Sequence, residues 1–126
     1  MNNFLFHPFV TGIRYSQLIL AIIIFLYAAL MPAQKAQGLL LPAVILHLLG
    51  GFLLTCSAWL ASYGRINLRK LLYFVIPFSV TTEFMQLLTH SRSTDPFDIV
   101  TNVVGISAGL FFCMLLEHGI KGISNN

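Results

Sequence analysis

The sequence predicts an all-α, polytopic membrane protein in which four transmembrane helices form an antiparallel bundle. Hydrophobic residues make up 57% of the 126 residues and charged residues only 9%, whereas an ordinary soluble domain carries roughly 25% charged residues. The mean hydropathy is correspondingly high, at +0.84. Four apolar stretches also approach the ~20 residues that a helix needs to cross a ~30 Å hydrocarbon core.

The four predicted helices are separated by short connections, which favour antiparallel packing of consecutive helices. Pro32 closes the first stretch, and the second ends before Gly64. The third follows Lys70, and the fourth begins at Pro96 or Phe97. No internal repeat or second domain is visible, so residues 1–126 are interpreted as a single transmembrane domain. The predicted helices are residues 15–31, 39–63, 70–90 and 96–116.

The first stretch also has features of a signal peptide, because Arg14 precedes an apolar run and small residues follow around Ala33 and Ala36. The apolar run is nevertheless long enough to span a membrane. We therefore expect the first helix to be retained as a transmembrane segment.

The basic residues predict an orientation in the cell (cytoplasmic or inner) membrane. With four spans, both termini lie on one side, and the positive-inside rule places the more basic side in the cytoplasm. We therefore expect cytoplasmic termini and outward-facing first and third loops, which carry Lys35 and Arg92. The basic residues are scattered rather than gathered in a patch, which argues against nucleic-acid binding. The cytoplasmic side carries Arg14, Arg65, Arg69, Lys70 and Lys121.

The cysteines give no sign of a cofactor or a metal site. Cys56 and Cys113 stand singly inside apolar runs, at no metal-binding or redox spacing. We expect both to fill buried space, and no cofactor or metal ion is predicted.

Glu83 is the strongest functional candidate, because it lies within the third apolar stretch, ~9 Å below its outer end. An ionisable group at such a depth costs ~2.5 kcal/mol or more unless it is paired or hydrated. Gln86 follows one turn later on the same face, and His90 continues that face. Pairing with Arg92 or with His47 is the structural alternative for Glu83.

Two further helices place polar residues at a similar depth. His47 lies ~12 Å below the outer end of the second stretch, and Asn102 lies ~7 Å below that of the fourth. Together with Glu83 they predict a polar pocket that opens to the outer face, with Arg92 above it.

The fourth stretch combines polar and small residues on one face, since Asp98, Asn102, Gly105 and Gly109 follow steps of four, three and four. Small residues at such spacing let helices approach closely. In the second stretch Gly50 and Gly51 follow His47 by one turn and predict a similar contact. We therefore assign these four glycines to helix packing.

Several polar residues have structural alternatives beside a functional role. Asp95 before Pro96 is a favourable helix start, and Asp98 would complement the helix dipole in the first turn. His47 and Asn102 can equally form hydrogen bonds between helices. These alternatives stay open at the level of sequence.

The arrangement of the polar residues resembles the VanZ-like family, named for a membrane protein associated with resistance to the glycopeptide teicoplanin. The resemblance covers roughly residues 39–116. Family members often carry an Asp-Lys pair just ahead of the histidine, where this chain has Ala43-Val44. Any role of that pair, such as charge contact with a lipid head group, is therefore not carried over. The resemblance rests on His47, Glu83-Phe-Met-Gln86, Arg92, Asp98-Ile-Val-Thr-Asn102, Gly105 and Gly109.

The leading hypothesis is that the outer pocket binds the head group of a membrane lipid or a lipid-linked cell-wall precursor. In that reading Arg92 contacts a phosphate, and Glu83 and Asn102 bind sugar or amide groups. The resemblance implies a contribution to teicoplanin resistance. The ligand-binding candidates are His47, Glu83, Gln86, Arg92, Asp98 and Asn102.

Two alternatives belong to other functional classes. One is a membrane-embedded hydrolase or transferase acting on such a lipid, with Glu83, His47 and Asp98 as candidate catalytic residues. The other is a helper subunit of an envelope complex, or a homo-oligomer, whose polar face packs against a partner helix.

Overall fold

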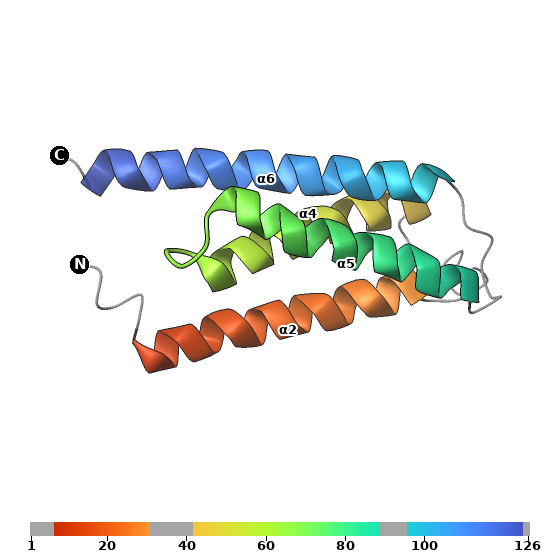
Figure 1. Ribbon diagram of the computed structural model, residues 1–126, viewed down its shortest axis with the longest axis horizontal. Coiled ribbons are helices and arrows are strands. Elements are labelled where there is room, and N and C mark those ends of the chain that lie inside the picture. Colours follow the sequence, from red (N-terminus) through yellow and green to blue (C-terminus); the bar gives the residue numbers. More distant parts are fainter. Residues whose placement is uncertain (1–6, 31–41, 89–95, 125–126) are drawn as a thin grey trace.

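A computed structural model describes residues 7–30, 42–88 and 96–124, which form four helices and contain no strand. Each helix is long and apolar enough to cross a membrane. The predicted all-α class with four potential spans is thus confirmed for the described residues. The helices lie side by side along the long axis of the molecule (Figure 1). They are α2 (Pro8–Leu30), α4 (Ala43–Ser62), α5 (Leu68–Leu88) and α6 (Pro96–Ser124).

The first and last helices are longer than the apolar stretches that predict them. α2 begins at Pro8 rather than at residue 15, because proline suits the first turn of a helix, where its missing N–H is not needed. α6 continues to Ser124 rather than stopping at residue 116. Glu117 and Lys121, four residues apart, form a 2.7 Å ion pair that supports this solvated extension.

The two middle helices keep to the expected lengths. Asn67 caps α5, because its Oδ1 accepts a 3.0 Å hydrogen bond from the Lys70 backbone N–H, so the helix begins slightly earlier than predicted. Gly64, with φ of 76°, turns the chain between α4 and α5. The expected residues 39–41 of the second helix and 89–90 of the third lie outside the described residues.

The most extensive helix–helix contact joins α4 to α6, which are not consecutive in the sequence. Positions on the two helices rise together along the interface, so α4 and α6 run in the same direction. A Cβ added at Gly105 would overlap the backbone of Leu48, and one added at Gly109 would lie 2.9 Å from the Phe52 carbonyl oxygen. The facing pairs are Leu48 with Gly105, Phe52 with Gly109, and Cys56 with Cys113.

The glycines of α4 contact two different helices. A Cβ at Gly50 would meet the ring of Phe25 on α2 at 2.9 Å. A Cβ at Gly51 would lie 2.7 Å from the backbone oxygen of Asn102 on α6. Adjacent glycines therefore let α4 approach its neighbours on two sides.

The thiols of Cys56 and Cys113 meet across the α4–α6 interface, with 3.9 Å between their sulfur atoms. Both cysteines are free, and Cys113 is fully buried. The two cysteines are 57 residues apart in the sequence, so the contact could not be predicted from their spacing. It arises because α4 and α6 run in the same direction.

Arg14 connects α2 to the C-terminal end of α4 through hydrogen bonds. Its guanidinium is buried and donates hydrogen bonds to three backbone carbonyls at the C-terminus of α4, which lack partners within the helix. A cation is also favoured at the negative end of a helix dipole. Arg14 thus has a packing role besides the topological one predicted for it. The acceptors are the carbonyl oxygens of Leu60 at 2.7 Å, Ala61 at 3.1 Å and Tyr63 at 2.8 Å.

The helices bury polar side chains and expose apolar ones. A compact apolar core lies between the helices, yet Ile19, Ile23 and Ile24 on α2 and many similar residues on the other helices face outward. Such a distribution reverses that of a soluble protein, in which buried polar groups are few. The apolar core consists of Phe25, Ala29, Leu54, Ala58, Leu71, Val75 and Ile106.

We predict that Gly105→Ala destabilises the protein, because the new methyl group would press on the backbone of α4. Overpacking of this kind costs ~1–3 kcal/mol. Unfolding in mixed detergent micelles measures the change. Gly119→Ala on the same helix is the control, since a Cβ there meets nothing within 4 Å, and it should raise stability by up to ~1 kcal/mol. Equal effects of the two variants would contradict the close α4–α6 contact.

Candidate functional site

Four buried polar side chains from three helices converge near one end of the bundle, and we call them the polar cluster. They are His47 of α4, Glu83 of α5, and Asp98 and Asn102 of α6. Each is at most 5% exposed. Of the residues that the sequence analysis placed at matching depth, His47 and Asn102 both contact Glu83.

Glu83 and Asn102 form the shortest contact within the polar cluster. Nδ2 of Asn102 donates a hydrogen bond of 2.7 Å to Oε1 of Glu83. A hydrogen bond to a carboxylate is stronger than one between neutral groups, and it joins α5 to α6. The Oδ1 atom of Asn102 is buried and accepts no hydrogen bond from the residues that the structure describes.

His47 lies between the two carboxylates of the polar cluster. Its Nδ1 is 3.9 Å from Oε1 of Glu83, and its Nε2 is 3.4 Å from Oδ2 of Asp98. Two buried carboxylates repel each other and lose hydration. An imidazolium placed between them would offset one of the two negative charges.

Asp98 also occupies a position on α6 that suits a carboxylate. It lies in the first turn of α6, where the helix dipole favours a negative group. Its contact with His47 connects α6 to α4 at the same time. The capping and pairing roles that the sequence left as alternatives thus coexist in the structure.

Gln86 makes its contact with a different helix. Its Nε2 donates a 2.6 Å hydrogen bond to the carbonyl oxygen of Ala29, in the last turn of α2. That carbonyl has no partner within its own helix, so Gln86 ties the end of α2 to α5. Whether Gln86 also contacts a ligand stays a prediction.

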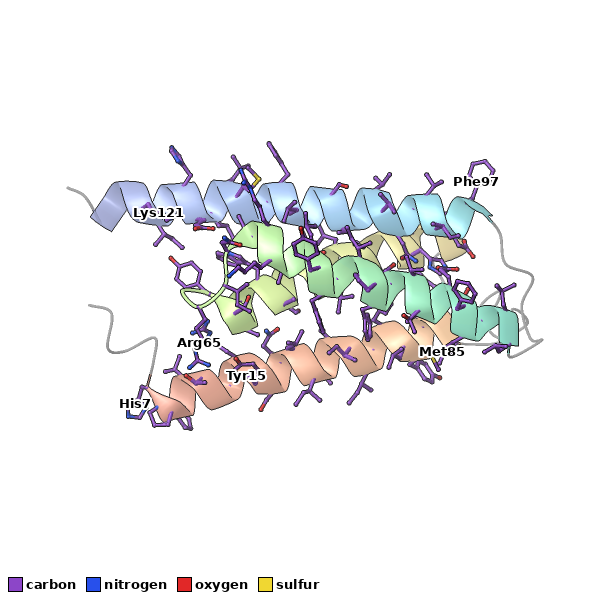
Figure 2. All side chains as sticks on the ribbon, in the orientation of Figure 1. His7, Tyr15, Arg65, Met85, Phe97 and Lys121 are labelled. Carbon is purple, nitrogen blue, oxygen red and sulfur yellow. The ribbon has the colours of Figure 1, made fainter. Side chains whose placement is uncertain are left out.

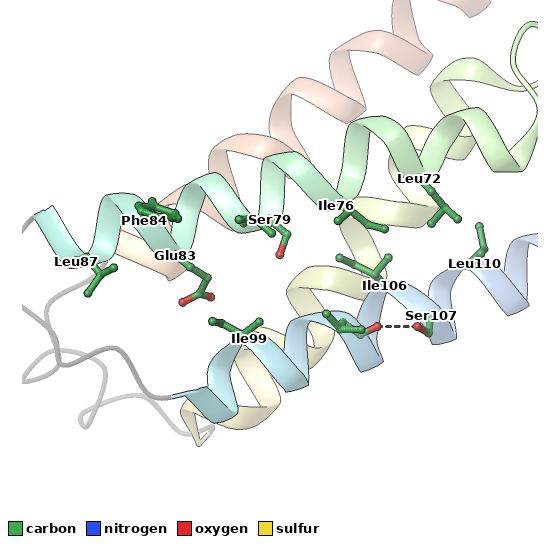
Figure 3. A pocket seen from close by; sticks show the side chains of 12 residues that line it. Leu72, Ile76, Ser79, Glu83, Phe84, Leu87, Ile99, Ile106, Ser107 and Leu110 are labelled. Carbon is green, nitrogen blue, oxygen red and sulfur yellow. Dashed lines mark hydrogen bonds between the residues drawn. The ribbon is translucent and has the colours of Figure 1, made fainter.

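A cavity of about 380 Å³ lies between α5 and α6, next to the polar cluster. We call it the α5–α6 cavity. Figure 3 shows the Glu83 carboxylate pointing from α5 toward α6 at this cavity. Glu83 is the one residue of the polar cluster on the wall. The wall consists of Leu72, Ile76, Ser79, Val80, Glu83, Phe84, Leu87, Ile99, Val103, Ile106, Ser107 and Leu110.

The sequence analysis missed the apolar character of this cavity. His47, Asp98 and Asn102 do not line the α5–α6 cavity; His47 contacts Asp98, and Asn102 donates to Glu83. The predicted polar pocket that opens to the outer face stays a prediction. A second, much smaller cavity of about 10 Å³ adjoins His47 on the α2 side. The apolar wall residues carry no distinctive sequence signal, because similar apolar residues are also exposed elsewhere on α5 and α6.

The described basic residues lie at the opposite end of the bundle. Arg65 and Lys121 stand at that end, and Met85 and Phe97 stand at the end of the polar cluster (Figure 2). Arg92, a predicted site residue, lies outside the described residues, as do its neighbours His90 and Asp95. Among the described residues, no three His, Cys, Asp or Glu side chains are arranged to hold a metal ion.

No family model, curated protein or solved structure matches this chain. The interpretation of the site therefore depends on the residues and contacts described above.

We predict that Glu83 and Asn102 are energetically coupled. Asn102→Leu removes the donor to a buried carboxylate and should cost ~1–3 kcal/mol of unfolding free energy. Combined with Glu83→Leu, the cost should fall below the sum of the single changes by ~1 kcal/mol or more. Unfolding in mixed micelles measures the three variants.

The matched control pairs Asn102→Leu with Glu117→Leu, whose carboxylate lies near the far end of α6 and should combine additively. Additivity of Glu83→Leu with Asn102→Leu would contradict the hydrogen bond.

Proposed function

We propose that this chain is a VanZ-like integral membrane protein that binds an amphiphile, a membrane lipid or a lipid-linked envelope precursor. The head group would lie at the polar cluster and an acyl chain in the α5–α6 cavity. The observation that carries the proposal is the position of Glu83, which belongs to the polar cluster and also lines the apolar cavity. A site with one polar end and one apolar side suits an amphiphile, which combines a polar head group with an apolar chain.

The proposed arrangement in the membrane is an antiparallel bundle with cytoplasmic termini and an outward-facing polar cluster. The four candidate spans support insertion. The described basic residues support the orientation, because they lie at the end opposite the polar cluster and basic residues favour the cytoplasmic side. The ligand would then enter from the outer leaflet of the cell membrane.

The size and shape of the α5–α6 cavity support an elongated apolar ligand. Its volume of about 380 Å³ lies within the ~300–1,000 Å³ of typical ligand sites. The wall extends along α5 from Leu72 to Leu87, which at 1.5 Å per residue is ~22 Å. The cavity lies between two helices that would face lipid, so an acyl chain could enter from the side.

A role in teicoplanin resistance is part of the proposal and comes from the resemblance alone. Its support is that the E-x-x-Q and D-x-x-x-N patterns supply Glu83 and Asn102, which share a hydrogen bond. A protein that binds envelope amphiphiles at the outer face would meet such a drug there.

We predict that Val103→Trp blocks ligand binding, because the indole would fill the α5–α6 cavity. Native mass spectrometry of the detergent-purified protein should show at least a ~10-fold loss of retained lipid. Val104→Trp is the control, since Val104 is 49% exposed against 53% for Val103, yet does not line the cavity. Equal lipid retention by both variants would overturn the proposal. The same assay on Glu83→Gln and Arg92→Ala tests the head-group contacts, and unchanged lipids in both would remove these residues from the site.

The row of Asp98, His47 and Glu83 also favours a second candidate function, acid–base catalysis on a bound lipid. In this arrangement Asp98 would orient His47, and Glu83 would meet the substrate at the cavity wall. A carboxylate and an imidazole within such reach are the usual groups for proton transfer. The reaction would be hydrolysis of, or group transfer from, an envelope lipid.

A lipid product formed by the wild type in reconstituted vesicles would support the catalytic candidate. We expect Glu83→Gln to lower the rate of formation by ~100-fold or more if Glu83 transfers the proton. Glu117→Gln makes the same chemical change at the far end of α6 and should leave the rate intact. Absence of any product from wild-type protein that retains lipid would exclude this candidate and leave binding as the function.

A further inference from the structure

Ser79 differs from the other hydroxyl side chains of α5 and α6 in its hydrogen bonding. It is 5% exposed and lines the α5–α6 cavity, and Figure 3 shows its hydroxyl pointing from α5 into the space toward α6. Within the described part of the chain this hydroxyl has no hydrogen-bond partner. The other described hydroxyl side chains of these two helices each donate to a backbone carbonyl of their own helix, namely Thr81, Thr82, Thr101 and Ser107.

The hydroxyl of Ser79 can therefore take a partner from a bound ligand. Burial of a hydroxyl without a hydrogen bond is unfavourable, and serine in a helix commonly avoids it by bonding to the helix backbone. Ser79 instead presents one donor to a cavity whose wall is otherwise mostly apolar. A ligand group that accepts a hydrogen bond at this point gains a donor where few other polar groups are available.

The position of Ser79 along the cavity indicates which part of a ligand it would meet. Ser79 precedes Glu83 by one turn on the same face of α5, which places it ~6 Å farther from the end of the helix. From Ser79 to Leu72 the wall continues for ~10 Å. A head group at Glu83 would thus be followed by a linking group at Ser79 and by a hydrocarbon chain beyond it. In a glycerolipid that linking group is an acyl ester, whose carbonyl oxygen accepts hydrogen bonds.

We infer that Ser79 is a specificity-determining residue that donates a hydrogen bond to the acyl carbonyl of the ligand. The α5–α6 cavity then takes acyl lipids in preference to polyprenyl lipids. This inference rests on the proposed function and chooses between its ligand classes. A polyprenyl chain is a hydrocarbon and would leave the hydroxyl without a partner, at the cost of a lost hydrogen bond.

The test uses three probes that share a phosphate head group: ester-linked phosphatidic acid, its ether-linked analogue with the same chain length, and a polyprenyl phosphate. Equal amounts are supplied together to delipidated protein, and native mass spectrometry resolves the retained lipids by mass. We expect the wild type to retain the ester lipid ~5-fold more strongly than the ether lipid, which corresponds to one hydrogen bond between neutral groups. The polyprenyl phosphate should also be retained less than the ester lipid.

Two serines on the wall of the same cavity provide the variant and its matched control. Ser79→Ala removes the proposed donor and should bring the ratio of ester to ether lipid close to one. Ser107→Ala makes the same change, but the hydroxyl of Ser107 already donates to the carbonyl oxygen of Val103. It should therefore leave the ratio unchanged.

The outcomes separate this inference from the proposal beneath it. Equal retention of ester and ether lipids by wild type, a preference for the polyprenyl phosphate, or the same ratio in Ser79→Ala as in Ser107→Ala would overturn the role of Ser79. Amphiphile binding stands in each of these cases if Val103→Trp still loses lipid and Val104→Trp does not. Equal lipid retention by the two tryptophan variants would overturn the binding proposal itself. The wild-type ratios decide the selectivity even if an alanine variant fails to fold.

Discussion

The arrangement of the site depends on the close backbone contact between α4 and α6. At Gly105 the two helices approach so closely that no side chain fits between them, which fixes both their separation and their register. This register places His47 of α4 beside the first turns of α6, within reach of Asp98. α5 is then connected to the pair through Glu83 and Asn102. The packing glycines and the polar residues are thus two parts of one interface.

Much of the fold and part of the site could be predicted from sequence, because both follow from the lengths of the apolar runs and from the positions of polar residues within them. The four potential spans follow from the length of the apolar runs, and depth follows from the rise per residue. Similar depths for His47, Glu83 and Asn102 therefore predicted a common level, and the structure brings these side chains into contact. Helix ends were less predictable, because Pro8 and the Glu117–Lys121 pair extend α2 and α6 beyond the apolar residues.

Features that depend on which helices are neighbours could not be predicted from the lengths of the apolar runs or from residue positions within them. Burial of Arg14 requires the C-terminus of α4 to lie beside the start of α2. Contact of Cys56 with Cys113 requires that α4 and α6 run in the same direction. The α5–α6 cavity is the space left where two apolar surfaces do not fill each other, and no single residue such as Val103 signals it.

The pairing of α4 with α6 also has a consequence for the order in which the protein is made. A chain synthesised only as far as α5 already contains His47 and Glu83, but neither Asp98 nor Asn102. In the proposed membrane arrangement, His47 and Glu83 would then have each other but would lack Asp98 and Asn102, and ionisable groups in hydrocarbon are costly without such partners. α6 follows the other three described helices in the chain, and its arrival supplies both the most extensive packing surface for α4 and the two remaining residues of the polar cluster.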